Sequence, residues 1–498
     1  MTELTSIAER VVRRRVRRDP KARFLPDVSA QLDALLGCPE LIVPSGHPAR
    51  RIQAFVGKLD TAALELRYSS LGRHGHDPKR LLALWLYAST IGIHLASELA
   101  RACQTDAALR LLAGGYSPSS ATLKRFRANN GAFFQSALEQ SVRMAQEEGH
   151  LVPEEMAVDS MRLRSHASLS AVRRKKRAED KLKRLHKLDA SQLDEQERIV
   201  HQQALARNQA VVDKCEQLGV ASYVCSNELS ALMKFPHGGA LPGHRLTVTA
   251  AGASQRFVIG VLVDAAPTDV GKLPAAATQA LQVLEQAGVP LDAQRQLLAD
   301  AGYWDAPSLQ FAQSIHERMQ IWIADARPRS QRQSKGLFGR EDFALSDDQR
   351  SVTCPAGRPM QGPESAGKGA RRWYGVGCPT CPLRPQCTKG ERRKFQIQLE
   401  LQQPRQQMQT RLQTPDAKAL YKKRSAIIEP VFASLESDMH YRRASSRSAQ
   451  TVVAEVLLKL LAHNVRRLNA AAKRRLCVLW LTLDSEQCWA LHPTKNLF

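Results

Sequence analysis

The sequence predicts an α/β protein in which a helical N-terminal region precedes a mixed sheet that carries two insertions. Three observations support this fold class. Apolar residues recur at helical spacing between residues 77 and 149. Short β-type runs then alternate with helical segments between residues 151 and 326. A segment rich in Arg, Gln, Gly and Pro, which contains four cysteines, separates these strands from a second helical region that begins near Asp416.

These changes in pattern predict the organisation of the chain. We expect a basic arm and a helical domain, an α/β core with a helical insertion, a Cys-rich insertion, C-terminal helices that complete the core, and a tail. The predicted boundaries are 1–150 for the arm and helical domain, 151–326 for the core, about 167–219 for its helical insertion, 327–415 for the Cys-rich insertion, 416–475 for the C-terminal helices and 476–498 for the tail.

The charge of the chain favours a polyanionic partner. There are 72 Lys and Arg residues against 48 Asp and Glu, which gives a formal net charge of +24. Neutralising phosphates releases counterions, so DNA or RNA is the simplest partner, although ribosomal contact or an anionic membrane surface fits the charge equally well. No apolar run is long enough to span a bilayer, and the first residues lack a secretory signal. We expect a cytoplasmic, nucleoid-associated protein.

Basic residues are concentrated in the N-terminal region. The arm at residues 11–24 is either a solvated tail or a phosphate-contacting segment. Asp77 before Pro78 predicts the start of a helix. A further helix ending at Gly149 is predicted to carry three basic residues on its early turns, and helix-turn-helix DNA binding or a solvated face would both explain them: Lys124, Arg125 and Arg127.

The sheet is predicted from several β-type runs. "PEEMAVDSMRLRSH" has a period near two around Asp159, and residues 244–252 and 256–266 are joined by a short Gly-containing turn that is typical of a hairpin. Between these strands, Leu182 and its neighbours predict one charged helix. Ser191 and Asp194 are typical of a capping box for a second helix, which runs to Gly219.

Asp300 directly follows an apolar run in "LLADAGYWD". An aspartate at this place often caps a turn through its own backbone. Open α/β sheets also place functional groups just beyond the carboxyl ends of their strands. Residues 319–326, "MQIWIADA", predict the next strand after another helix.

Three acids occur in an order that suits phosphoryl transfer on DNA. Two divalent cations, roughly 3.5–4 Å apart, can activate the attacking hydroxyl and stabilise the leaving oxygen without a protein nucleophile. Magnesium needs only a few carboxylates on rigid elements. An RNase H-like sheet would supply one acid on its first strand, one at the end of its fourth strand and one on a later helix. Asp159, Asp300 and Glu429 occur in this order.

Five blocks give this order a specific resemblance. They are "MAVDSMRLRSHAS", "PGHRLTVTAAG", "TDVGKLPAA", "LLADAGYWD" and "YKKRSAIIEPVFASLE". In this sequence of blocks the chain resembles bacterial insertion-sequence transposases of the DDE superfamily, which have a helical N-terminal domain and an RNase H-like catalytic core. The similarity runs from about residue 40 to residue 470.

The resemblance implies roles for individual residues. Asp159, Asp300 and Glu429 would be the catalytic triad and bind Mg²⁺, for which Mn²⁺ substitutes. Tyr421 and Arg424 would contact phosphates near the cleaved strand. Double-stranded DNA, as element ends and as target, would be the partner of a homo-oligomer, because pairing two ends needs at least two active sites.

The last block, "YKKRSAIIEPVFASLE", departs from the family pattern. Glu436 stands where a Lys is expected seven residues after Glu429, and Ala433 replaces the usual glycine. Residues i and i+7 share a helix face, so Glu436 is predicted to point toward the same metal site. Either the phosphate contact is altered or activity is reduced. Pro430 leaves open whether Glu429 begins the helix or lies within it.

Tyr303 and Trp304 follow Asp300, and they either stack on a flipped base or pack in the core. Trp304 is our candidate for the DNA contact. The cysteines at 354 and in "CPTCPLRPQC" are either a structural Zn²⁺ site of four thiolates or part of a reduced, packed insertion; they are Cys354, Cys378, Cys381 and Cys387.

Two other functions compete with transposition. His440 to Arg443 fits the HxxR pattern of tyrosine recombinases, but no tyrosine follows Tyr441, so this interpretation fails. A non-catalytic DNA-binding protein, either a decayed transposase or a zinc-containing regulator, would explain the charge and the cysteines but not the three acids. We therefore expect a DNA transposase that binds the ends of its element and catalyses metal-dependent strand cleavage and strand transfer.

Overall fold

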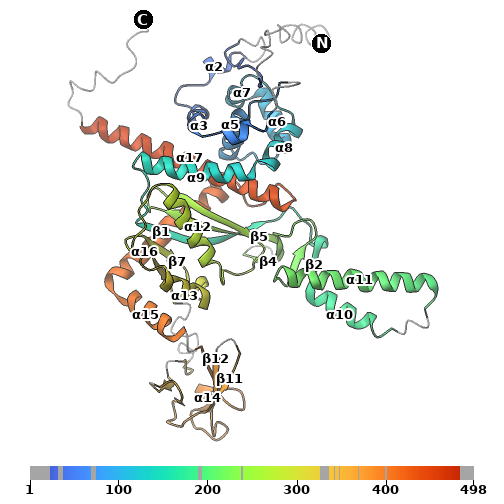
Figure 1. Cartoon of the computed structure of the whole chain (residues 1–498), viewed down its shortest axis with the longest axis vertical. Coiled ribbons are helices and arrows are strands. Elements are labelled where there is room, and N and C mark those ends of the chain that lie inside the picture. Colours follow the sequence, from blue (N-terminus) through green and yellow to red (C-terminus); the bar gives the residue numbers. More distant parts are fainter. Residues whose placement is uncertain are drawn as a thin grey trace.

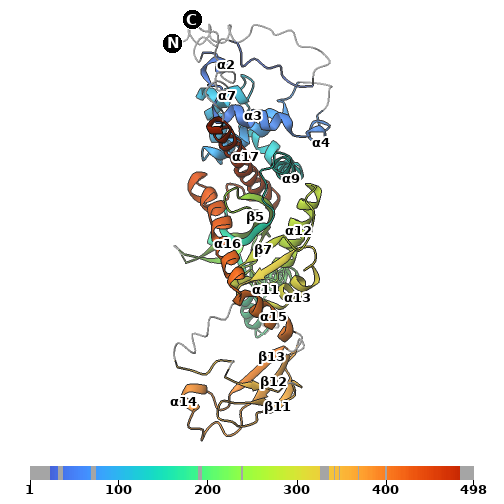
Figure 2. The same ribbon diagram turned by 90° about the vertical axis from the view of Figure 1, so that its left-hand side faces the viewer.

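The structure is a computed structural model of the chain. It describes residues 23–31, 37–68, 74–188, 193–236, 239–325, 336–340, 342–346, 348–367, 370–398 and 401–482. Most of the predicted basic arm and most of the predicted tail therefore lie outside the described residues. A group of helices lies at one end of an elongated molecule, a sheet covered by helices lies in the middle, and a small β unit lies at the other end (Figures 1 and 2). Within the described residues, no helix has both the length and the apolar character needed to cross a bilayer.

The central sheet is mixed, as predicted. β1 runs antiparallel to β5 and parallel to β7, and β7 runs parallel to β8. Both β4 and β6 pair antiparallel with β5, so the path is β4-β5-β1-β7-β8 with β6 attached to β5. The strands are β1 Glu155–Arg164, β4 Ala231–Phe235, β5 Gly239–Ala251, β6 Phe257–Asp264, β7 Gln296–Ala299 and β8 Gln320–Ile323. The predicted hairpin is confirmed as β5 and β6.

Helices cover both faces of this sheet. Figure 2 shows α16 on one side of the strands and α12 and α13 on the other. Apolar residues of α12 such as Leu273 and Leu284 are fully buried, which accounts for its packing against the sheet. The helices are α12 Leu273–Gln286, α13 Ala306–Ser314, α15 Gln402–Gln413 and α16 Pro415–Ala433, which continues into a π-helical turn, η6 Ser434–Asp438.

The N-terminal helices form one core with the sheet and the C-terminal helix. A continuous cluster of buried side chains extends from Val43 to Leu468, so burial couples these parts thermodynamically. The helices are α2 Pro39–Ile42, α3 Pro48–Lys58, α4 Ala62–Glu65, α5 Pro78–Thr90, α6 Ala96–Thr105, α7 Ala107–Leu112, α8 Ser120–Asn129, α9 Gly131–Glu147 and α17 Ala449–Thr482.

Helix starts are partly as predicted. The Asp77 side chain accepts the Lys79 N–H at 2.8 Å, which confirms the predicted cap of α5. The single helix predicted to end at Gly149 is wrong, because the chain breaks into α8 and α9 at the buried residue Asn130. The Asn130 side-chain amide donates to the carbonyl of Phe126 at 2.7 Å, and this local bond competes with helix continuation.

A helical pair projects from the sheet between β1 and β4 (Figure 1). Its two helices, α10 Lys175–Leu185 and α11 Glu195–Gln217, rise from a short antiparallel ladder of β2 Val172–Arg174 and β3 Ser222–Val224. The two helices were predicted, and Ser191 of the predicted capping box lies outside the described residues. Asp194 is itself the N-cap and exchanges bonds with Glu197, because a capping box needs Glu or Gln at its third helical position.

The Cys-rich segment is more regular than its composition predicts. β11 Gln361–Ser365, β12 Ala370–Tyr374 and β13 Lys394–Gln398 form a sheet over a small core that includes Trp373 and Phe395. The unit also contains β9 Ala344–Leu345, β10 Val352–Thr353 and α14 Arg384–Cys387. Its strands are too short, and too rich in Arg and Gln, for their period to be evident from sequence.

Candidate active site

Asp159 and Asp300 lie at neighbouring positions in the central sheet. β1 and β7 are parallel, and Val158 is paired with Ala299, so the two acids follow at the same level. Asp300 accepts the Gly302 N–H at 2.8 Å, which caps the short 3-10 turn after β7. The turn-capping role and the position at a strand end, which the sequence left as alternatives, therefore occur together.

Helix α16 brings two more predicted residues to these acids. Arg424 Nη1 lies 2.9 Å from Asp159 Oδ2, and both side chains are largely buried, at 17% and 20% exposure. The Tyr421 hydroxyl donates to the carbonyl of Ala299 at 2.9 Å. Because residues three apart on a helix share a face, the spacing of Tyr421 and Arg424 allows both to reach the strand ends.

The electrostatics of the site are those of crowded carboxylates. The pKa of Asp300 is raised by burial and, next, by the nearby charge of Asp159, while the Gly302 N–H and Arg424 oppose this shift. Burial raises the pKa of Tyr303, which is fully inaccessible to solvent, so the core-packing alternative holds for this aromatic. Positive charge near the two acids would therefore be stabilising.

A third acid near Asp300 was not singled out from the sequence. One carboxylate oxygen of Asp269 contacts both the Ser160 hydroxyl and the guanidinium of Arg245, which is 3% exposed. Its other oxygen faces Gly302, where a Cβ would lie 3.0 Å from Asp269 Oδ2 and 2.9 Å from Asp300 Oδ1. The block "TDVGKLPAA" contains Asp269, but only the buried arginine reveals its place beside the site.

Glu429 lies apart from these acids. It is an exposed residue of α16 five positions after Arg424, which corresponds to roughly 7.5 Å along the axis and a different face. Pro430 lies inside the helix, so Glu429 does not begin it. The described residues contain no group of three or more His, Cys, Asp or Glu side chains placed to hold a metal ion. The metal-binding triad therefore stays a prediction.

Glu436 lies in a π-helical turn and not in the regular helix assumed from sequence. Residues Ser434–Asp438 form a π-helical turn, in which each residue turns through a smaller angle than in an α-helix. A place for Glu436 beside the metal site therefore stays a prediction.

The predicted DNA-binding residues differ in accessibility. Lys124 and Arg125 are exposed on α8. Arg127 is 5% exposed, stacks over Trp85 at 4.5 Å and donates to the carbonyl of His94 at 2.8 Å, so it supports the helical core. Trp304 is half-buried and packs against the main core.

The four predicted zinc ligands lie around one small pocket of the β unit, beside α14. Burial raises the pKa of the Cys387 thiol. The nearby Arg393 lowers this pKa, and the three other cysteines raise it. Cys378 Sγ accepts the Arg393 N–H at 3.5 Å, and a Cβ at Gly375 would lie 2.5 Å from this sulfur. The thiols gather without forming a metal-binding group among the described residues, so zinc stays a prediction. These residues are Cys354, Cys378, Cys381 and Cys387.

Two models of known protein families match parts of this chain. A model described as transposase DDE domain matches residues 353–469, and a model described as transposase domain (DUF772) matches residues 38–129. These two matches support an insertion-sequence DDE transposase. The DDE match includes the four cysteines of the β unit and α16 but not Asp159 or Asp300. Searches of curated proteins and of solved structures gave no match.

Proposed function

We propose that this transposase binds the ends of its insertion sequence, cleaves DNA strands there and joins them to target DNA, in reactions that need a divalent cation. The observation that supports catalysis is the meeting of Asp159, Asp300 and Arg424 where β1, β7 and α16 come together. A protein that only binds DNA has no need for crowded, partly buried carboxylates whose charges oppose one another.

The sheet supports an RNase H-like core as part of this proposal. β6, β5 and β1 are antiparallel neighbours, and β7 and β8 then run parallel to β1. An acid within the first strand and an acid directly after the fourth strand of this core are the two positions that the proposed chemistry needs. Asp159 and Asp300 occupy them.

Asp159 and Asp300 fit a hard cation such as Mg²⁺ or Mn²⁺. Carboxylate oxygens are its preferred ligands. The pKa of Asp300 is raised first by burial and next by the charge of Asp159, and a bound cation would oppose both effects. When bound, such a cation supplies an activated water or 3′-hydroxyl and stabilises charge on the phosphate. In cleavage, a water oxygen bonds to phosphorus while the bond from phosphorus to the 3′ oxygen breaks. In strand transfer, the released 3′-hydroxyl takes the place of water.

The remaining residues would hold the DNA. The planar guanidinium of Arg424 suits a phosphate, and it already lies beside the acids. We propose that Tyr421 supports this position from α16, that Lys124 and Arg125 contact the duplex from α8, and that a homo-oligomer pairs two element ends. Trp304 remains our candidate for a contact with an unpaired base.

The metal dependence of cleavage tests this function. The full chain is incubated with a labelled duplex that carries the terminal repeat of its own element, in Mg²⁺, Mn²⁺ or EDTA. We expect nicks at the element boundary with either metal and none in EDTA, while a gel shift shows end binding in all three. Binding without nicking in either metal would favour the non-catalytic alternative, which the separation of Glu429 from the other acids also favours.

Glu429 is proposed as the third acid, after a rearrangement of α16 on DNA. Glu429→Gln should then lower the nicking rate by roughly 100-fold, because a neutral amide is a poor ligand for a hard cation. Glu436→Gln, on the adjoining π turn, is the matched control and should change the rate less than about threefold. Single-turnover nicking measures both. Equal rates for Glu429→Gln and wild type would refute the assignment and direct attention to Asp269.

A further inference from the structure

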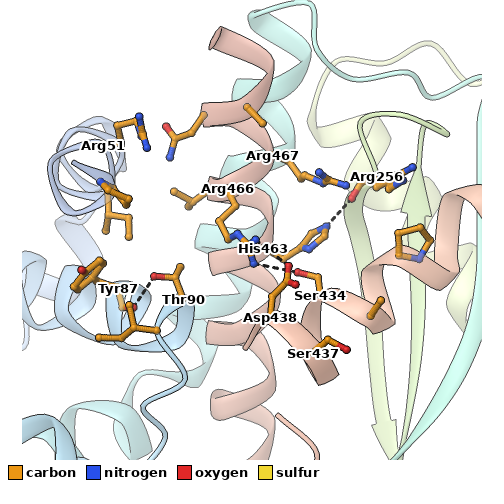
Figure 3. A pocket seen from close by; sticks show the side chains of 18 residues that line it. Arg51, Tyr87, Thr90, Arg256, Ser434, Ser437, Asp438, His463, Arg466 and Arg467 are labelled. Atoms are coloured by element: carbon orange, nitrogen blue, oxygen red, sulfur yellow. Dashed lines mark hydrogen bonds and ion pairs between the residues drawn. The ribbon is translucent and has the colours of Figure 1, made fainter. Parts of the chain in front are cut away.

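A basic pocket lies away from the acids, between the N-terminal helices and the C-terminal helices. Its volume is about 660 Å³. Figure 3 shows Arg51 and Tyr87 on the side of α3 and α5, Arg466 and Arg467 on α17, and Arg256 on the turn that joins β5 and β6. The pocket therefore depends on three parts of the chain that are distant in sequence.

The lining carries an excess of positive charge. Four arginines face one acid, Asp438, which pairs with Arg466 at 2.9 Å in an ion pair whose side chains are 41% and 47% exposed. His463 is neutral at physiological pH, because burial lowers its pKa to about 4. Its ring Nε2 lies 2.9 Å from the Arg256 carbonyl, which fixes the turn that presents the Arg256 guanidinium.

One donor in the pocket lacks an internal acceptor. The Nε of Arg51 is buried and has no hydrogen-bond partner among the described residues. The hydroxyl groups of Ser434 and Ser437 line the wall formed by the π turn, and Arg466 Nη1 lies 3.4 Å from Ser434 Oγ. Guanidinium and hydroxyl donors around a hollow of this size suit the oxygens of a phosphate group, because arginine matches phosphate geometry with several parallel N–H groups.

The pocket and the acids lie at different points along one helix. Arg424 of α16 contacts Asp159, whereas Pro430, six residues later and roughly 9 Å along the axis, lines the pocket. A single helix therefore connects the proposed cleavage site with the basic pocket. A DNA strand whose cleaved phosphate lies at the acids would need a separate anchor for its more distant phosphates.

We propose that this pocket binds a backbone phosphate of the element end, away from the bond that is cleaved. The proposal rests on the proposed function for the choice of DNA as ligand. The phosphate contact fixes the position of the duplex and carries no sequence information of its own. Its loss should therefore weaken binding to every duplex by a similar factor and leave the chemical step unchanged.

A double variant tests the pocket. Arg51→Gln with Arg466→Gln removes two of its charges, and Arg143→Gln with Arg318→Gln is the matched control, since Arg143 and Arg318 are exposed and paired with Glu147 and Glu285. Binding of the labelled element-end duplex is measured by fluorescence anisotropy from roughly 50 to 300 mM salt, because affinity that comes from phosphate contacts falls steeply as salt rises. We expect about tenfold weaker binding and a salt slope smaller by about 1 to 2 for the pocket variant only.

A second measurement removes the phosphate charge instead of the arginine. Single methylphosphonates, which are neutral, are placed one at a time along the element end. Wild type should lose affinity at one position outside the cleaved bond, and the pocket variant should show no further loss there. Uniform losses along the duplex, or equal losses in both proteins, would overturn the proposal.

The outcomes separate this inference from the proposed function. If wild type nicks DNA and the pocket variant binds as wild type does, the pocket proposal fails while catalysis stands. If the pocket variant loses affinity but wild type never nicks, the pocket stands and catalysis fails. The cleavage rate at saturating DNA should be equal in wild type and the pocket variant, since the pocket does not touch the reacting atoms.

Discussion

Replacing Asp300 by asparagine should abolish strand cleavage, with a rate loss of about 10³-fold or more, and should change end binding less than about threefold. Asparagine keeps the shape of the side chain and its cap on the turn, because its carbonyl oxygen can still accept the Gly302 N–H. It removes the charge that would hold a cation beside Asp159. Single-turnover nicking of a labelled element end, together with gel shifts in EDTA, measures both effects.

The chain offers a close control for this substitution. Asp305 is also an N-cap, and its side chain accepts the Ser308 N–H at 2.9 Å. Its other oxygen accepts the Gly271 N–H at 2.7 Å, so Asp305→Asn disturbs similar turn contacts on the same connection. We expect this variant to nick DNA at a rate near that of wild type. Cleavage retained by Asp300→Asn would eliminate Asp300 as a catalytic residue.

Local signals predicted much of the frame around this site. Alternation around Asp159 and the short turn between residues 252 and 256 identified β1 and the β5–β6 hairpin, because strand periodicity and turn chemistry act over a few residues. Asp77 before Pro78 located the start of α5 for the same reason. The position of Asp300 directly after β7 also followed from an apolar run alone.

Tertiary contacts decided what sequence could not. Arg127 has the spacing of an exposed basic residue on a helix, but its guanidinium lies over Trp85. It donates to the His94 carbonyl and the Ser446 hydroxyl inside the protein. Asp269 belongs beside Asp300 only because Arg245 holds it there across the sheet. The π turn that contains Glu436 has no short-range signature, so a regular helix was the natural expectation. Long-range pairing thus determined which charged residues serve the fold and which serve the site.

A second large effect is expected at Glu455 of α17, a carboxylate that is 1% exposed. It accepts bonds from the Ser445 N–H and from the hydroxyls of Ser445 and Ser446, each at 2.8 Å. Arg127 Nη1 lies 3.8 Å away, so Glu455 joins the loop before α17 to the helix α8. This cluster couples the N-terminal helices to the C-terminal helix through charge.

Lys459 is a second buried basic residue, and its charge interacts with the Glu455 carboxylate. It is 2% exposed and donates to the Ser89 hydroxyl at 3.1 Å. Burial lowers its pKa to about 7, and the negative charge of Glu455 opposes this shift. Removing Glu455 would leave the buried Arg127 cation without its counter-charge and would lower the pKa of Lys459 further. An uncompensated buried charge is costly in a medium of low dielectric.

Glu455→Ala should therefore lower the free energy of unfolding by about 3–5 kcal/mol. Glu40→Ala is the control: Glu40 pairs with Arg50 at 2.7 Å but is 42% exposed, so its loss should cost about 1 kcal/mol or less. Urea unfolding followed by far-ultraviolet circular dichroism measures both variants. Because the buried core is continuous from the N-terminal helices to α17, we expect the whole transition of Glu455→Ala to shift to lower urea. Equal midpoints for the two variants would show that the buried Arg127 guanidinium finds other compensation.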